Sequence, residues 1–234
     1  MADFVLVHGA WHGAWCWKKI LPGLWAAGHR AFPVTLTGTG ERAHQLSPDI
    51  TLRMHVDDVA AIVESEELQR AILVGHSYAG MLITAVADRM PDRIARLVYL
   101  DAVVPHPGES WSRTHPPQTQ AQRREAIAKT GSIPPADPGL FGLSGEDAAW
   151  VARRQRPHPG GVYDDSLHFD AARVAALPRT FIDCNAPALA TIAVMRERVR
   201  KEPDWQVHEI ATGHDAMISA PGELLRLLLD AANV

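Results

Sequence analysis

The chain has 234 residues, of which 47% are hydrophobic and 21% charged, with a net charge of -4 and a pI near 6.3. These values predict one globular domain over 1–234 with a sizeable core. They provide no basic face for nucleic acid or an anionic membrane, so we expect neither partner and a small neutral or apolar ligand instead.

The first predicted element is a buried strand over 4–7. There is no basic leader and no apolar segment of membrane-spanning length, so we expect a cytoplasmic location. The strand is followed by His8-Gly9-Ala10-Trp11-His12-Gly13-Ala14-Trp15, whose glycines permit a positive φ or a close approach to a ligand. The flat rings and polar tips of this loop make Trp11 and His12 candidates for substrate contact.

Three more elements are predicted before the middle of the chain: a helix over 17–27, a strand over 30–36 and a helix over 51–64. Gly38-Thr39-Gly40 follows the second strand and suggests a nucleotide site. The third glycine and the acidic residue of such a site are missing, so no nucleotide or other cofactor is expected. Cys16 and Cys184 are too few for a disulfide framework and are predicted to be free thiols.

A tight turn, Gly75-His76-Ser77-Tyr78-Ala79-Gly80, separates a predicted buried strand over 71–74 from a helix over 81–87. On such a turn the serine hydroxyl is pushed out of the backbone, and the amides at the helix start can stabilise an oxyanion. Small residues are required where strand and helix pack this closely. Ser77 is therefore a candidate nucleophile.

The next strand is predicted over 94–101 and ends on the carboxylate of Asp101. From 105 to 178 the regular pattern gives way to Pro, His, Gln and Gly-rich stretches, with helical pieces near 120–129 and 145–154. So long an insertion predicts a cap or lid over the sheet rather than a separate domain. Its histidines lack metal-ligand spacing, and no metal site is expected.

The alternation resumes with a strand over 179–184, a helix over 189–200, a strand over 206–210 and a helix over 221–232. Six strands alternating with helices predict an α/β fold: a six-stranded, mostly parallel sheet with helices on both faces. Ligands of such sheets bind at the carboxyl ends of the strands. The candidate residues at these ends are Gly9, Ser77, Asp101 and His214.

His214 is the candidate base, because a serine hydroxyl is a poor nucleophile until histidine removes its proton. It follows the last strand, in the chain order of nucleophile first and histidine last. The loop from His8 to Trp15, Gly75-His76-Ser77, and Gly213-His214 followed by Met217 together make the chain resemble the α/β-hydrolase superfamily. The resemblance covers essentially the whole chain and points to the branch of small, salicylate esterase-like methylesterases and hydroxynitrile lyases. It implies an oxyanion hole formed by the backbone N–H groups of Ala10 and Tyr78.

The acid of the expected triad is not at the position in the sequence where this branch usually carries it. The branch usually carries an aspartate at the position that Pro187 occupies here. Two replacements are available: Asp101, after the strand that follows the nucleophile strand, and Asp183, one residue before Cys184. Strand alternation points Asp183 away, so we favour Asp101 and keep open a dyad without an acid.

The expected function is hydrolysis of a small, apolar or aromatic carboxylic ester through an acyl-enzyme. No cofactor is expected, and a homodimer is one possible assembly. Candidate pocket walls are Trp11, Trp15, Tyr78, Trp111 and Phe141. One alternative is a binding protein with little turnover, which the proline at position 187 supports. A hydroxynitrile lyase is disfavoured, because Gly9 and Asp215 stand where the lyases resembling this chain have a threonine and a lysine.

Overall fold

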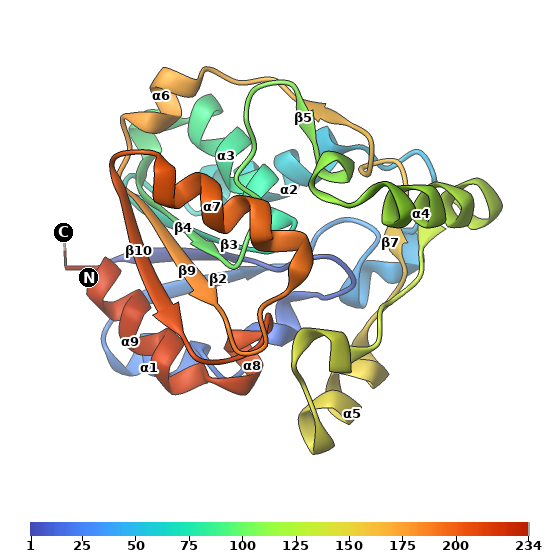
Figure 1. Ribbon diagram of the computed structural model, residues 1–234. Helices are drawn as coiled ribbons and strands as arrows, with labels where there is room; N and C mark the ends of the chain where they lie inside the picture. Colours follow the sequence, from blue (N-terminus) through green and yellow to red (C-terminus); the bar gives the residue numbers. More distant parts are fainter. Residues whose placement is uncertain (234) are drawn as a thin grey trace.

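The computed structural model describes residues 1–233 of the chain. A six-stranded sheet lies at its centre, and every neighbouring pair of its strands is parallel (Figure 1). The strands are β1 (Asp3–Val7), β2 (Arg30–Val34), β3 (Ala71–His76), β4 (Ile94–Leu100), β9 (Arg179–Cys184) and β10 (Trp205–Ile210). Their order is β10-β9-β4-β3-β1-β2, so β3 and β4 are central and their carboxyl ends are adjacent.

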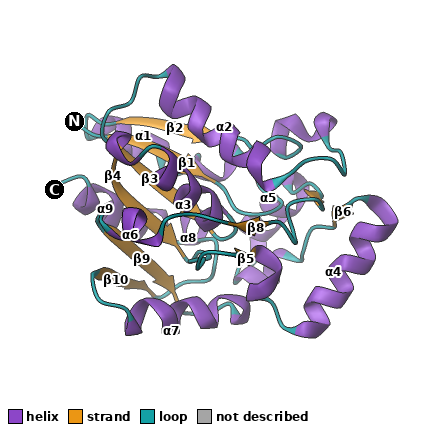
Figure 2. Ribbon diagram, turned by 90° about the horizontal axis from the view of Figure 1, so that it is seen from above, coloured by secondary structure: helices purple, strands orange, loops and turns teal. Residues whose placement is uncertain are grey.

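Helices cover both faces of this sheet, as predicted (Figures 1 and 2). One face carries α1 (Leu21–Ala26), the short α8 (Ala216–Ser219) and α9 (Pro221–Ala231). The other face carries α2 (Leu52–Ser65), α3 (Ala79–Arg89) and α7 (Ala193–Lys201). The molecule is therefore a three-layer arrangement with the sheet in the middle.

Alternate side chains of each central strand enter different cores. In β1, Phe4 and Leu6 pack with α1 and α9, whereas Val5 and Val7 pack with α2 and α3. Because both faces are covered, the buried strands read as continuous apolar runs in the sequence. Each fully buried large aliphatic side chain stabilises the fold by roughly 2 kcal/mol.

Most predicted elements differ from the structure by a few residues in extent. The helix expected over 17–27 is split into a 3-10 turn at Ala14–Trp17 and α1, because Pro22 lacks an N–H and is tolerated only in the first turn of a helix. The strand expected over 30–36 stops at Val34. The helix expected over 189–200 begins as a 3-10 turn at Ala190–Ile192 before α7.

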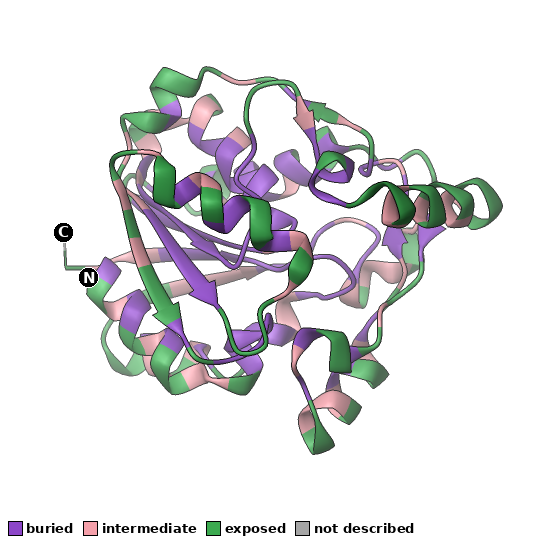
Figure 3. Ribbon diagram, in the orientation of Figure 1, coloured by how far each residue is buried: buried purple, intermediate pink, exposed green. Residues whose placement is uncertain are grey.

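The insertion between β4 and β9 folds over the carboxyl ends of the strands. Its elements are β5 (Glu109–Ser110), α4 (Pro117–Thr130), β6 (Ser132–Ile133), α5 (Gly145–Arg154), β7 (His158–Pro159), β8 (Ser166–Leu167) and α6 (Ala171–Ala175). Two small antiparallel pairings, β5 with β8 and β6 with β7, tie it together. Helix α4 extends from the body and is exposed along most of its length, whereas the central strands are buried (Figures 2 and 3). The part of the insertion that faces the sheet is therefore the part that can shape a site.

Two further predictions can be compared with the structure. Cys16 and Cys184 are buried free thiols, as predicted. Among residues 1–233, every helix is too short or too polar to span a bilayer.

Candidate active site

Ser77 occupies a strained position between β3 and α3. Its φ is 56°, in the left-handed region that residues other than glycine rarely adopt. The backbone is held there by two hydrogen bonds: the N–H of Ser77 donates to the oxygen of Leu100 at 3.2 Å, and its oxygen accepts from the N–H of Val103 at 2.9 Å. The strain is thus imposed by the neighbouring strand end, and it turns the serine toward a cavity.

The glycines around this turn are required by close backbone approaches. A Cβ at Gly80 would lie 1.8 Å from the oxygen of Val103, and one at Gly75 would lie 2.8 Å from the oxygen of Ala79. A Cβ at Gly9 would lie 2.8 Å from the Cβ of Ser77. The expected steric reason for small residues is present at Gly75 and Gly80, and the structure adds the same reason at Gly9.

The loop after β1 differs from expectation in one respect. Its positive φ, 66°, belongs to Trp11 and to neither of the loop glycines. Trp11 is fixed in this conformation by hydrogen bonds at both of its polar ends: its oxygen accepts from the N–H of Arg156 at 3.0 Å, and its indole Nε1 donates to the oxygen of Ile133 at 3.1 Å. Both partners lie in the insertion, so the insertion positions this aromatic wall.

His214 and Asp101 are joined although 113 positions separate them in the chain. Nδ1 of His214 lies 2.7 Å from Oδ2 of Asp101, and both side chains are buried. Asp101 follows β4 directly, has a φ of 40°, and is anchored by its N–H to the oxygen of Ile182 at 2.8 Å. No hydrogen bond joins Ser77 Oγ to His214 within residues 1–233, but the two side chains line the same cavity. Such bonds are often long before substrate binds.

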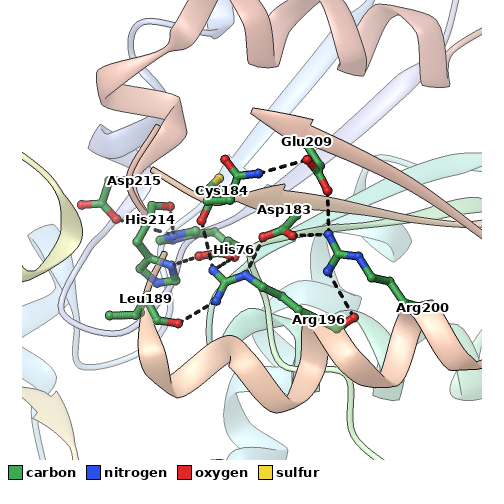
Figure 4. A network of polar contacts seen from close by, with 11 residues as sticks. His76, Asp183, Cys184, Leu189, Arg196, Arg200, Glu209, His214 and Asp215 are labelled. Carbon is green, nitrogen blue, oxygen red and sulfur yellow. Dashed lines mark hydrogen bonds and ion pairs between the residues drawn. The ribbon is translucent and has the colours of Figure 1, made fainter. Parts of the chain in front are cut away.

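A buried arginine, Arg196, bonds the oxygen of Asp101 that does not face His214. Figure 4 shows this arginine beside Asp183 and Leu189. Arg196, on α7, donates from Nη2 to Oδ1 of Asp101 at 2.7 Å and from Nε to Oδ1 of Asp183 at 2.5 Å. Asp183 Oδ2 accepts from Arg200 at 2.6 Å. The remaining acceptors of Arg196 are the carbonyl oxygens of Cys184 and Leu189. Both oxygens of Asp183 are therefore engaged with arginines, and it does not contact His214.

Sequence reasoning did not identify Arg196. The available signal was its place on α7, where it is buried between Met195 and Val199 on the face that packs inward. A charged side chain on a buried helix face is rare unless it is paired. That signal indicates a buried ion pair but does not say with which carboxylate.

A second buried network of hydrogen bonds involves His12, Asp215 and His76. Nε2 of His12 lies 3.2 Å from Oδ2 of Asp215, and Nδ1 of His12 lies 2.7 Å from the oxygen of Ala10. Burial alone would lower the pKa of His12 and raise that of Asp215, but their mutual attraction raises the pKa of His12 and lowers that of Asp215 to about 2. The ring of His76 bonds the oxygen of His214 at 3.1 Å. His12 thus supports the loop at Ala10 rather than lining the cavity.

Within residues 1–233, one group of ligand-type side chains is compact enough for a metal ion. His76, His214 and Asp215 offer ligand atoms within 4.8 Å of one another. Each already has a partner in the protein, because His214 bonds Asp101 and Asp215 bonds His12 and lies 3.5 Å from His76. The absence of a metal site stays a prediction.

The cavity above Ser77 and His214 has a volume of about 380 Å³, within the range of small-molecule sites. Of the five expected aromatic walls, Trp11, Trp111 and Phe141 line it. Trp15 packs against His12 instead, and Tyr78 is fully buried with its hydroxyl 3.2 Å from Nδ1 of His55.

The insertion supplies much of the remaining lining, including Thr119 and Arg123 of α4 and the turn around Leu140. The backbone N–H groups of Ala10 and Tyr78 donate no hydrogen bond to any group of residues 1–233, although both residues are buried. A buried N–H without a partner is uncommon, and a ligand oxygen would provide one.

The Ser77 turn, His214 and the sheet topology fit a known family. A model of the alpha/beta hydrolase family matches residues 4–227. The chain belongs to the alpha/beta hydrolase family. A carbendazim hydrolyzing esterase from Nocardioides sp. (strain SG-4G) is 39% identical over 97% of this chain and 98% of that protein. Esterase PIR7B from Oryza sativa subsp. japonica is 30% identical over 98% of this chain and 95% of that protein.

Solved structures agree on the fold. An extracellular alpha/beta-hydrolase from a Paenibacillus species has a TM-score of 0.86 with 21% identity, covering 99% of each chain. The methylesterase MES16 from Arabidopsis has a TM-score of 0.80 with 25% identity, over 99% of each chain. The relatives from Nocardioides and Oryza are both named esterases, which supports ester hydrolysis by this chain.

Proposed function

We propose that this alpha/beta hydrolase cleaves small carboxylic esters through an acyl-enzyme on Ser77. The observation that carries the proposal is the 2.7 Å contact between His214 Nδ1 and Asp101 Oδ2, made at the edge of the cavity that Ser77 also lines. This contact leaves Nε2 of His214 as the ring nitrogen available to the serine. A carboxylate on Nδ1 fixes the tautomer that a base needs and stabilises the imidazolium that forms.

The reaction follows from these positions. Ser77 Oγ attacks the ester carbonyl while its proton passes to Nε2 of His214, and the carbonyl oxygen becomes an oxyanion. The unpaired N–H groups of Ala10 and Tyr78 bind that oxyanion, and each is worth on the order of 3 kcal/mol of transition-state stabilisation. His214 then protonates the departing alcohol, and a water molecule activated by the same histidine hydrolyses the acyl-serine and releases the acid.

Two alternatives are weaker. A binding protein with little turnover was suggested by the proline at position 187, but Asp101 supplies His214 with a carboxylate from another strand. For lyase chemistry, Gly9 carries no hydroxyl, and Asp215 is buried in an ion pair with His12. Neither residue offers the group that a hydroxynitrile lyase of similar sequence would use.

The ester is proposed to be small and aromatic, because three aromatic rings line a cavity of about 380 Å³. Carbendazim, which the relative with 39% identity is named for hydrolysing, is a carbamate rather than a carboxylic ester and is tested beside such esters. We propose that no cofactor is needed. The cytoplasmic location and the homodimer stay predictions, which cell fractionation and light scattering would test.

The test of the function uses the purified protein with a fluorophosphonate probe and with p-nitrophenyl acetate. We expect covalent labelling at Ser77 and hydrolysis, both lost in Ser77→Ala. A chain that is not labelled, and whose hydrolysis does not exceed that of Ser77→Ala, would refute ester hydrolysis by this site. Ser112→Ala is a matched control, because Ser112 is buried within the insertion, bonds Ser110 at 2.9 Å and does not line the cavity.

A further inference from the structure

Arg123 extends from α4 into the cavity that Ser77 and His214 line. Its guanidinium carbon lies 5.3 Å from the ring centroid of Trp11 and 4.9 Å from that of Trp111. A third ring, that of Tyr163, lies 5.6 Å away. Stacking on aromatic faces holds a guanidinium in place while leaving its edge free to donate hydrogen bonds.

The charge of Arg123 has no carboxylate partner. Among residues 1–233, Arg123 forms no ion pair, whereas the next residue, Arg124, pairs with Asp164. Its Nη1 lies 2.9 Å from Nε2 of His115. Burial and the charge of Arg123 lower the pKa of His115 to about 3, so the ring is neutral and accepts this hydrogen bond.

An unpaired cation in a partly desolvated cavity is energetically costly unless a ligand supplies the counter-charge. Arg123 is half-buried, and the groups closest to it are aromatic rings and a neutral imidazole. A carboxylate is the partner that a planar guanidinium binds best, through two parallel hydrogen bonds. The cavity thus has a reacting end at Ser77 and a second, cationic feature on its cap side.

We infer that Arg123 binds an anionic group of the substrate, so that the preferred substrates are aromatic esters with a carboxylate away from the scissile bond. The inference rests on the proposed function for the reacting end only. The aromatic part lies between the walls formed by Trp11, Trp111 and Phe141. The carboxylate neutralises the charge of Arg123.

The kinetic test compares monomethyl terephthalate with methyl para-toluate, which has the same ring and a neutral methyl group. We expect the wild-type kcat/KM to favour the anionic ester by about tenfold or more, the value of one charge-assisted contact of about 1.4 kcal/mol. This preference is expected to disappear in Arg123→Met and to survive in part in Arg123→Lys, which keeps the charge. Arg124→Met is the matched control, because Arg124 is exposed and pairs with Asp164. An unchanged preference in Arg123→Met would overturn the inference.

A binding measurement separates this inference from the proposed hydrolysis. Calorimetry with Ser77→Ala is expected to show tighter binding of monomethyl terephthalate than of methyl para-toluate, and the difference is expected to vanish in Ser77→Ala with Arg123→Met. Equal affinities for the two esters in Ser77→Ala would overturn the inference. If the wild type hydrolyses neither ester, the proposed function fails, while the difference in affinity still decides the role of Arg123.

Discussion

Arg196 donates a 2.7 Å hydrogen bond to Oδ1 of Asp101, while Oδ2 of the same carboxylate lies 2.7 Å from Nδ1 of His214. Each oxygen of this buried carboxylate thus has its own charged or polar partner. A carboxylate held at both oxygens cannot rotate away from the histidine, and the guanidinium offsets part of the cost of burying its charge. Arg196 also connects Asp101 to Asp183, the other aspartate that the sequence offered for this role.

Asp101→Asn is expected to lower kcat for p-nitrophenyl acetate by a factor on the order of 10³ to 10⁴, because the imidazole loses the carboxylate that fixes its tautomer. Asp183→Asn is the comparison, since Asp183 bonds Arg196 and Arg200 rather than His214. Its kcat is expected to fall far less. Steady-state kinetics of both variants decides the assignment, and equal or reversed losses would refute the role of Asp101.

Arg196→Gln is expected to lower kcat while changing KM little, because Arg196 acts on the reaction only by holding Asp101. Arg196→Lys keeps a charge near Asp101 and is expected to restore part of kcat. Arg200→Gln serves as the control, because Arg200 bonds Asp183 and Glu209 but not Asp101. Loss of a buried ionic partner also destabilises the fold by about 3 kcal/mol, so thermal melts accompany the kinetics. A rise in KM at constant kcat would contradict a positioning role.

Gly80→Ala is expected to destabilise the protein by roughly 2 kcal/mol, because the added Cβ would lie 1.8 Å from the oxygen of Val103 and force the serine turn apart. Gly222→Ala is the matched control: it lies in the first turn of α9 with nothing within 4 Å of an added Cβ. That change is expected to raise stability by up to about 1 kcal/mol. Urea unfolding measures both. A Gly80→Ala variant as stable as the wild type would show that the turn can relax.

The His12–Asp215 pair predicts that the free energy of unfolding differs between the wild type and Asp215→Asn by an amount that depends on pH. We call this difference the stability gap. The raised pKa of His12 contributes stability that is complete below 6.5 and is lost as the pH rises through the raised value. The lowered pKa of Asp215 contributes stability that is present above 3.8 and is lost as the pH falls toward about 2. Between these limits both contributions are complete, so the gap is expected to be wider near pH 5.5 than near pH 9.

Urea unfolding at the two pH values measures this gap. Asp164→Asn is the control, because it breaks an exposed pair with Arg124, whose charge does not change over this range. Its gap is expected to be small and constant. A gap for Asp215→Asn that widens toward pH 9 would contradict the pairing with His12.

The sequence by itself determined the sheet, its covering helices and the tight turn that carries Ser77. Apolar runs such as Ala71–Val74 and the helical spacing of Leu52–Ser65 are local patterns, set by which faces must be buried. The glycines around Ser77 are also local, since they reflect how closely β3 approaches α3. His214 could be placed from chain order and the position of the last strand alone.

Only the tertiary structure decided which groups surround that serine. Asp101 follows β4, and Asp183 lies one residue before the end of β9. Strand alternation favoured Asp101, but the local sequence did not show that it reaches His214. Parallel pairing of β4 with β9 brings the two carboxylates to the same sheet edge, and α7 then inserts Arg196 between them. Arg123 reaches the cavity only because the insertion folds back over the strand ends. Such contacts join residues far apart in the chain, and their geometry depends on side-chain packing that no local pattern encodes.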